Sequence, residues 1–402
     1  MTNQIRRGFR PNEKHVRIVL SLVIAVLLLL LGCKNATPPD DDDSNNYDPR
    51  NITRIDDHIE AQPDIAIDSR GNIHLVYFGA SEYNDPTNVY YIHNTMNETW
   101  IEPVMLSDST EHDSKNPQII IDSQDNVHVI WEGGDELRTF YTRKITADSW
   151  SEPKPITTTF NPLPQLAIDP QDNLHMVGMG INRGTYRQRQ GEQWIPEETL
   201  PNTLTNPSLV VSLDGTAHVV FETGSQLIGY LRRTPDGTWQ DWEQVSPADS
   251  TYPYNGYPWV ADVAVYRDTV YVCWTKRYTQ QILLRRRFPD GSWSEVESVP
   301  AVQSYTSGTG PYEGKLAANQ QGLFLAWEEK REPDGEHEIY YTKRFHDGAW
   351  LSANSLSQTP TPSLGLGIYL KDKTLHLVWQ ELLEYSKYGN VDIYYTSINT
   401  GE

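Results

Sequence analysis

The feature that most constrains the fold is a hairpin motif that returns along most of the chain. Its first copy, Gln62 to Phe78, reads QPDIAIDSRGNIHLVYF, which is an apolar strand, a polar turn containing Gly71 and a second apolar strand. Further copies begin at Asn116, Leu163 and Asn206, and weaker ones are centred on Tyr271, Phe324 and His376. A unit repeated in this way predicts a repeat architecture.

Each copy has a second half, such as TFYTRKITADSW or IYYTKRFHDGAW, which predicts two more strands. The four strands, A to D, recur about every 50 residues, which is the size of a propeller blade. The seventh copy lacks strand D, and Asn51 to Ile55 can supply it. We therefore predict an all-β fold, a seven-bladed β-propeller over residues 51–402 whose ring is closed by an N-terminal strand. Six blades is the alternative, if one weak copy is not a blade.

Ten of the 12 Trp residues occupy two repeated positions. Six open strand D, namely Trp100, Trp150, Trp194, Trp239, Trp293 and Trp350. Four end strand B, namely Trp131, Trp274, Trp327 and Trp379. Because a buried Trp removes about 150–250 Å² from water, repeated Trp positions indicate packing between blades rather than a ligand site.

The N-terminal segment is predicted to be a targeting signal rather than part of the fold. Basic residues from Arg6 to Arg17 precede 14 largely apolar residues, Ile18 to Leu31, and then Gly32 and Cys33. The apolar run is shorter than the roughly 20 residues of a membrane-spanning helix. The segment resembles the signal of bacterial lipoproteins, and the resemblance implies cleavage before Cys33 and acylation of that residue. Residues 1–32 are then the signal peptide and residues 33–50 a lipidated Cys and acidic tether. The expected location is the cell envelope, extracytoplasmic, at the outer membrane or cell surface.

Charge and cysteine content narrow the partners. The formal net charge is −21, which argues against nucleic acid as a ligand. The two Cys are Cys33 and Cys273, so lipidation of Cys33 leaves no intrachain disulfide, and Cys273 in an apolar strand is expected in the core. The sequence implies no cofactor, although a structural cation such as calcium stays open. We expect a monomer.

Three turns carry a resemblance to a known family. Asp236 to Trp239, Asp290 to Trp293 and Asp347 to Trp350 are each Asp-Gly-x-Trp, similar to the BNR or Asp-box repeat of sialidase-like propellers. The resemblance implies the propeller fold, because these boxes are structural in that family. A sialidase also needs an Arg triad, a Tyr–Glu pair and an acid Asp. No motif in this chain matches them, and we assign no catalytic residue.

Five blades have His at one position of strand B, namely His74, His128, His175, His218 and His376. A metal or catalytic ring is one interpretation. The other is structural, because Asp68, Asp122 and Asp169 each stand six residues before a His and can meet it across the hairpin. We favour the structural interpretation, because one role repeated around a ring does not make one active site.

Binding residues are expected on the face formed by the D–A and B–C connections, which vary between blades. The candidate ligand-binding aromatics are Tyr252, Tyr254, Tyr257 and Trp259, which precede or open blade five, and the candidate cation is Arg277. Tyr312 belongs to a second aromatic loop. Acids near the end of strand B, Glu132 and Glu328 among them, are candidate ligand-binding groups at the same mouth, against the simpler interpretation that they are solvated.

The favoured hypothesis is a cell-envelope lipoprotein whose propeller binds a glycan or protein partner through this face, without catalysis. The alternative is a carbohydrate-active enzyme, either a sialidase-like glycosidase or a polysaccharide lyase. A pair of carboxylates, or a His and Tyr pair beside Arg, at the mouth of the channel would favour the enzyme.

Overall fold

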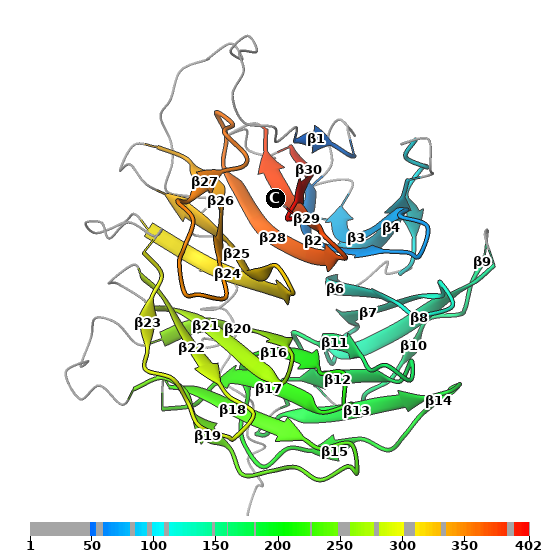
Figure 1. Cartoon of the computed structure of the whole chain (residues 1–402). Helices are drawn as coiled ribbons and strands as arrows, with labels where there is room; N and C mark the ends of the chain where they lie inside the picture. Colours follow the sequence, from blue (N-terminus) through cyan, green and yellow to red (C-terminus); the bar gives the residue numbers. More distant parts are fainter. Residues whose placement is uncertain are drawn as a thin grey trace, which may run out of the picture.

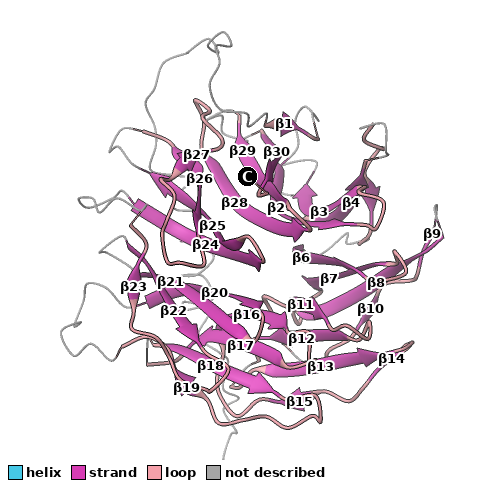
Figure 2. Ribbon diagram, in the orientation of Figure 1, coloured by secondary structure: helices cyan, strands magenta, loops and turns pink. Residues whose placement is uncertain are grey.

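The computed structural model describes residues 49–53, 59–80, 85–94, 99–107, 112–146, 149–158, 160–180, 182–225, 227–247, 258–276, 281–300, 310–330, 335–383 and 390–401, without the side chains of residues 59, 146 and 258–260. Strands joined by turns make up these ranges, which contain no helix (Figure 2). Accordingly, none of the described residues belongs to a helix long and apolar enough to span a membrane.

The strands form seven antiparallel sheets. Blade 1 contains β2 (Ile59–Ile67), β3 (Ile73–Ala80), β4 (Asn88–His93) and β5 (Val104–Met105). Blade 2 contains β6 (Ser114–Ile121), β7 (Val127–Gly133), β8 (Arg138–Thr146), β9 (Ser149–Trp150) and β10 (Lys154–Pro155). Blade 3 contains β11 (Gln165–Ile168), β12 (Leu174–Gly178), β13 (Thr185–Gln190), β14 (Gln193–Trp194) and β15 (Glu198–Thr199).

The remaining sheets repeat this order. Blade 4 contains β16 (Thr205–Val211), β17 (Ala217–Glu222), β18 (Ile228–Arg233) and β19 (Glu243–Gln244). Blade 5 contains β20 (Pro258–Tyr266), β21 (Thr269–Lys276), β22 (Gln281–Arg287) and β23 (Glu297–Ser298). Blade 6 contains β24 (Gly310–Asn319), β25 (Gly322–Lys330), β26 (His337–Arg344) and β27 (Asn354–Ser355). Blade 7 contains β28 (Ser363–Lys371), β29 (Thr374–Leu382), β30 (Val391–Asn399) and β1 (Arg50–Asn51).

The seven sheets stand around a central axis with strand A of each blade innermost (Figure 1). Each innermost strand contacts the innermost strand of the next blade, and β28 contacts β2, so the ring is closed. The seven-bladed propeller is confirmed. Its apolar core lies between blades, where clusters from neighbouring sheets pack face to face.

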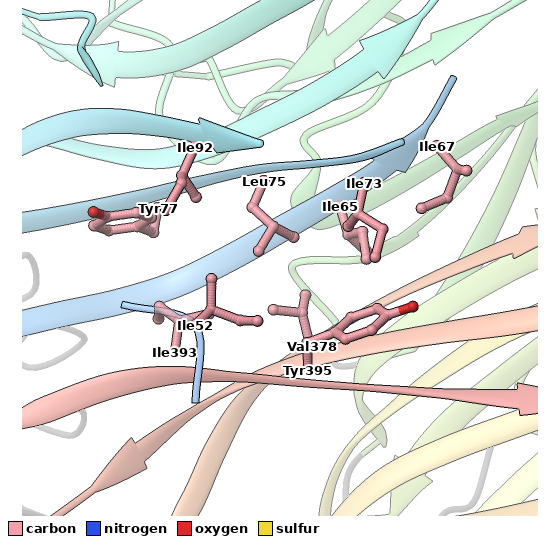
Figure 3. Close-up of a cluster of buried hydrophobic side chains, with 10 residues drawn as sticks. All are labelled: Ile52, Ile65, Ile67, Ile73, Leu75, Tyr77, Ile92, Val378, Ile393 and Tyr395. Atoms are coloured by element: carbon pink, nitrogen blue, oxygen red, sulfur yellow. The ribbon is translucent and has the colours of Figure 1, made fainter. Parts of the chain in front are cut away.

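The ring closes as the sequence predicts, through the start of the fold. Strand β1 pairs with β30, and the Ile52 amide donates to the Ile393 carbonyl at 2.7 Å. The Thr53 hydroxyl accepts from the Ile393 amide at 3.0 Å. Figure 3 shows Ile52 and Ile393 of blade 7 facing Leu75 of blade 1 in one buried cluster. Strand β1, with Ile52 and Thr53, therefore completes blade 7 and packs at its seam with blade 1.

The repeated Trp residues pack as predicted, with one difference in register. The four Trp of strand B are at most 2% exposed. Of the other six, Trp150 and Trp194 lie in β9 and β14, while the rest form isolated bridges to strand C. The main strand D is a two-residue segment a few residues further on, such as β19 or β23. Strand D is thus shorter than the sequence pattern suggests.

Candidate ligand-binding face

Seven residues occupy equivalent positions on the innermost strands, at one level of the ring. Each of these strand A residues pairs with the strand B residue two positions after the repeated His position. In most blades it follows a β-bulge in strand A. We call this set the channel ring: Asp64, Gln118, Gln165, Ser208, Asp262, Lys315 and Gly367. Its members alternate with core residues such as Ile65, because side chains on a strand point alternately to opposite faces.

The two acids of the channel ring connect blades. Asp64 accepts a 2.9 Å hydrogen bond from the Ile119 amide of blade 2. Asp262 accepts 2.6 Å and 2.7 Å bonds from the Ser208 hydroxyl and the Leu316 amide, in the blades on either side. Burial raises the pKa of Asp64 to about 6, although the hydrogen bond from the Ile119 amide lowers it. The ring is therefore partly a structural network that holds the innermost strands together.

Lys315 is the cation of the channel ring. Its ammonium lies 2.7 Å from Glu313 Oε1, and both side chains remain about one-third exposed. Burial lowers the pKa of Lys315, but Glu313, Asp262 and Asp64 outweigh it, so the pKa is raised and the ammonium stays charged. A positive charge surrounded by carboxylates thus lies among the innermost strands.

The acids near the end of strand B are not solvated, which corrects the simpler interpretation made from the sequence. Glu132 and Glu328 are both less than 10% exposed. Glu132 accepts from the Asn116 amide group at 2.8 Å and from the Leu163 backbone amide of the next blade at 3.1 Å. Glu328 accepts from the Gly365 backbone amide of the next blade at 2.5 Å. Both carboxyl groups therefore connect neighbouring blades at the bulge of strand A.

The next acids along the strand are buried as well. Glu329 and Glu381 are fully buried, and each accepts from the indole of the Trp two residues before it, Trp327 at 2.8 Å and Trp379 at 3.1 Å. Thr361 and Ser363 also donate to Glu381, each at 2.7 Å. These carboxylates therefore bind hydroxyl and indole donors, where the sequence suggested that they bind water.

Blade 6 concentrates chemically useful groups at the loop-bearing face. Strand β24 begins there, β25 ends there and β26 begins there, which gathers Tyr312, Glu313, Lys315, Glu328 and His337; we call these the blade-6 cluster. The rings of Tyr312 and His337 are in contact, with centroids 4.8 Å apart. His337 is 7% exposed, and its Nδ1 has no hydrogen-bond partner among the described residues. An aromatic pair thus lies next to an ion pair and a buried acid.

The electrostatics of the blade-6 cluster separate its two acids. Burial, and then the nearby Glu313 carboxylate, raise the pKa of Glu328 to about 8, so Glu328 is protonated at neutral pH. Burial, and then Lys330, lower the pKa of His337 to about 4, so its imidazole is neutral. Burial and Glu328 raise the pKa of Tyr312. The site presents a neutral acid, a neutral imidazole and a charged Glu–Lys pair, all of which can exchange hydrogen bonds with a polar ligand.

The repeated histidines form pairs as predicted. Asp68, Asp122 and Asp169 lie 3.5, 3.3 and 3.3 Å from the imidazole of the His six residues later. The other ring nitrogen contacts a strand C tyrosine hydroxyl in all five blades, for example Tyr141 at 2.8 Å from His128. These rings are buried, and no cluster of three or more metal-ligating side chains occurs in the described ranges.

The structure locates only part of the predicted site. Tyr252, Tyr254, Tyr257, Arg277 and Cys33 lie outside the described residues. Trp259 lies in β20, but its side chain is not described. Glu132 and Glu328 face the seams between blades, in blades 2 and 6, and are not brought together.

Sequence reasoning missed His337. It stands outside the repeated His position, and only the pairing of β25 with β26 brings it to the same end of blade 6 as Tyr312. Lys315 was missed for a similar reason, since its place in the channel ring depends on the bulge of β24.

No protein-family model matches the chain, and no curated protein matches its sequence. Solved structures share its fold. Polysaccharide lyase Uly1 superposes with a TM-score of 0.58 at 8% identity, over 85% of this chain and 90% of the lyase. A protein of unknown function from Dyadobacter fermentans gives 0.53 at 11%, over 87% and 97% of the two chains. The endosialidase of phage phi92 gives 0.51 at 12%, over 89% and 70%. At these identities the likeness shows the β-propeller fold and nothing about activity.

Proposed function

We propose that this chain is a lipid-anchored cell-envelope protein whose propeller binds a glycan through its loop-bearing face. The blade-6 cluster is the observation that carries the binding proposal. Sugars present apolar C–H faces as well as hydroxyl groups. The Tyr312–His337 pair offers aromatic surface, and the accessible Glu313–Lys315 pair offers an acceptor and a donor beside it. The polysaccharide-directed proteins that share the fold add support at the level of class only.

A glycan array on residues 49–402, with hits measured by calorimetry, tests the binding proposal. We expect Tyr312→Ala to weaken the best hit about ten-fold or more. The loop variant Tyr252→Ala/Tyr254→Ala tests the aromatic loop in the same way. The matched control is Tyr266→Ala, because the ring of Tyr266 also contacts a histidine, His346, but among the turns of the opposite face.

Two results would contradict glycan binding. One is an array without hits, accompanied by capture of a protein partner by the same face. The other is equal weakening by Tyr312→Ala and Tyr266→Ala, which would show that the loss is not local to the blade-6 cluster.

The anchor has its own test. The proposal rests on the sequence Leu30-Leu31-Gly32-Cys33 after a basic and apolar leader. We expect the full chain to enter the detergent phase and to incorporate labelled fatty acid, and Cys33→Ala to do neither. Labelling of the Cys33→Ala variant would overturn the assignment.

Catalysis on carbohydrate is the second candidate function, and one observation favours it. Burial and the neighbouring Glu313 raise the pKa of Glu328, and a pair of acids in which one has a raised pKa is the arrangement used in glycoside cleavage. Release of reducing or unsaturated ends from polysaccharides by the wild type, lost in Glu328→Gln, would establish it. Binding without product release would leave the binding proposal standing alone.

A further inference from the structure

A cavity of about 240 Å³ lies on the opposite face of the propeller, at the seam between blades 3 and 4. Its walls come from the turn between β11 and β12, from β12 and β13 of blade 3, and from β18 and two turns of blade 4. The side chains that matter for the argument are Asp169, His175, Gln188, Gln190, Arg233 and Asp236. We call it the seam pocket. It belongs to the A–B and C–D turns and shares no residue with the blade-6 cluster.

At the seam pocket, blade 3 differs from most of the other blades. The residue paired with the repeated strand B position is Arg or Lys in four of the other blades, namely Arg143, Arg232, Arg286 and Lys343. Blade 3 has Gln188 there, paired with His175. Gln188 is shorter and uncharged, and Gln190 follows it on the same face of β13, 3.2 Å from its amide oxygen. A neutral amide surface thus takes the place of the Arg or Lys that four other blades have at this register.

The charges around the seam pocket disfavour an anionic ligand. Burial raises the pKa of Asp169, but hydrogen bonds from Asn173, His175 and Gln171 outweigh it, so this carboxyl is ionised. Arg233 is already paired with Glu198 at 2.8 Å. Burial lowers the pKa of His175, which is therefore neutral. With Asp236 as a second carboxylate in the wall, sulfate, phosphate or uronate groups would meet net negative charge.

The size and lining of the seam pocket suit one small polyhydroxylated ring. The volume is below the roughly 300–1,000 Å³ of pockets for drug-sized ligands and corresponds to about eight waters. Three glutamine amides, each both a donor and an acceptor, lie in the wall, and Ile195 and Pro235 add apolar surface. We propose that the seam pocket binds a neutral monosaccharide unit, as a second carbohydrate site on the face away from the loops. This site does not depend on the loop-bearing face.

Saturation-transfer NMR and calorimetry with free glucose, galactose, mannose, N-acetylglucosamine and glucuronate test the proposal. We expect binding of at least one neutral sugar in preference to glucuronate. Gln190→Phe should fill the pocket and weaken this binding ten-fold or more, and Gln188→Met should weaken it while keeping the side-chain length. The matched control is Ile145→Phe, since Ile145 holds the equivalent position of blade 2 and is exposed.

The outcomes separate this site from the proposed one. Loss of neutral-sugar binding in Gln190→Phe but not in Ile145→Phe or Tyr312→Ala supports the seam pocket, whatever happens on the glycan array. Absence of neutral-sugar binding to the wild type, a preference for glucuronate, or equal binding by wild type and a folded Gln190→Phe protein would overturn it.

Discussion

The repeated histidine is the residue that best links this sequence to its fold. Its Asp partner was predictable, because the separation of six residues places both at the base of one hairpin. Its tyrosine partner was not, because contacts such as His376 to Tyr395 depend on the register of strand C against strand B. Blade 6 fills the same position with Phe324, stacked on Tyr341, so the unit tolerates an apolar ring.

His376→Phe should therefore fold and lose pH sensitivity. Burial lowers the pKa of His376 to about 4, so between about pH 6.5 and 4 the unfolded state binds the extra proton and stability falls as pH falls. We expect the variant to be about 1–2 kcal/mol less stable at pH 7, because the hydrogen bond between His376 and the Tyr395 hydroxyl is lost. Between pH 7 and pH 5, the free energy of unfolding should fall by about 1–2 kcal/mol less in the variant than in the wild type. Urea unfolding at both pH values measures this, and parallel losses would contradict it.

Glu60 has the opposite effect on how stability changes with pH. It is 2% exposed, bonded to Thr53 and Tyr77 and close to Asp392, and burial raises its pKa to about 8. The folded state holds the proton, so stability falls as pH rises from about 4.5 to 8. We expect Glu60→Gln to be nearly neutral at pH 6 and more stable than the wild type by roughly 2 kcal/mol at pH 9. Unfolding curves at the two pH values decide, and a variant that follows the wild type would refute the protonated carboxyl.

At the scale of the element, neighbouring blades are joined by a repeated Arg–Glu–Trp unit. In blade 5, Arg287 lies 2.9 Å from Glu243 of blade 4, and the Trp293 indole donates to the same carboxylate at 2.7 Å. Blades 4 and 6 repeat it with Glu198 and Glu297. The Trp ring also packs edge-on against a strand C tyrosine of the preceding blade, as Trp293 does on Tyr230. Strand D is only two residues long, and these side chains fix it to the next blade.

Glu243→Gln should cost about 1–3 kcal/mol of stability, because Arg287 is 9% exposed and would lose the negative charge that it contacts. The matched control is Glu152→Gln, since Glu152 and Lys154 are 83% and 72% exposed and 3.9 Å apart. We expect the control to change stability by less than about 0.5 kcal/mol. Chemical denaturation measures both. Equal effects would show that the Arg–Glu–Trp unit adds no stability between blades.

The difference between contacts within one hairpin and contacts between blades explains which features could be predicted from the sequence. Blade number and closure follow from local periodicity, because each hairpin is specified within about 20 residues. The repeated Trp positions could be assigned to packing for the same reason. The partners of Glu132, Glu243 and Glu328 lie in the neighbouring blade, and local patterns hold no information about that distance. The blade-6 cluster and the seam pocket are likewise products of packing between strands and blades.

At the scale of the molecule, the ring depends on one short segment. Ile52 and Thr53 occupy in blade 7 the place of Leu106 and Ser107 in blade 1. The Ser107 hydroxyl accepts from a strand C amide just as that of Thr53 does. The buried side chain of Ile52 alone is worth about 1.5–3 kcal/mol, and without β1 the outer edge of β30 would be exposed.

A chain that begins at residue 54 should therefore be much less stable than one that begins at residue 49, with Ile52→Ala in between. We expect the shorter chain to unfold at lower denaturant and to associate through the open edge of β30, because unpaired strand edges recruit other chains. Denaturation curves and size-exclusion chromatography compare the three proteins. The residue-49 chain is the control, since it keeps β1 and lacks everything before it. Equal stability and equal elution of the two truncated chains would show that the ring holds without its N-terminal strand.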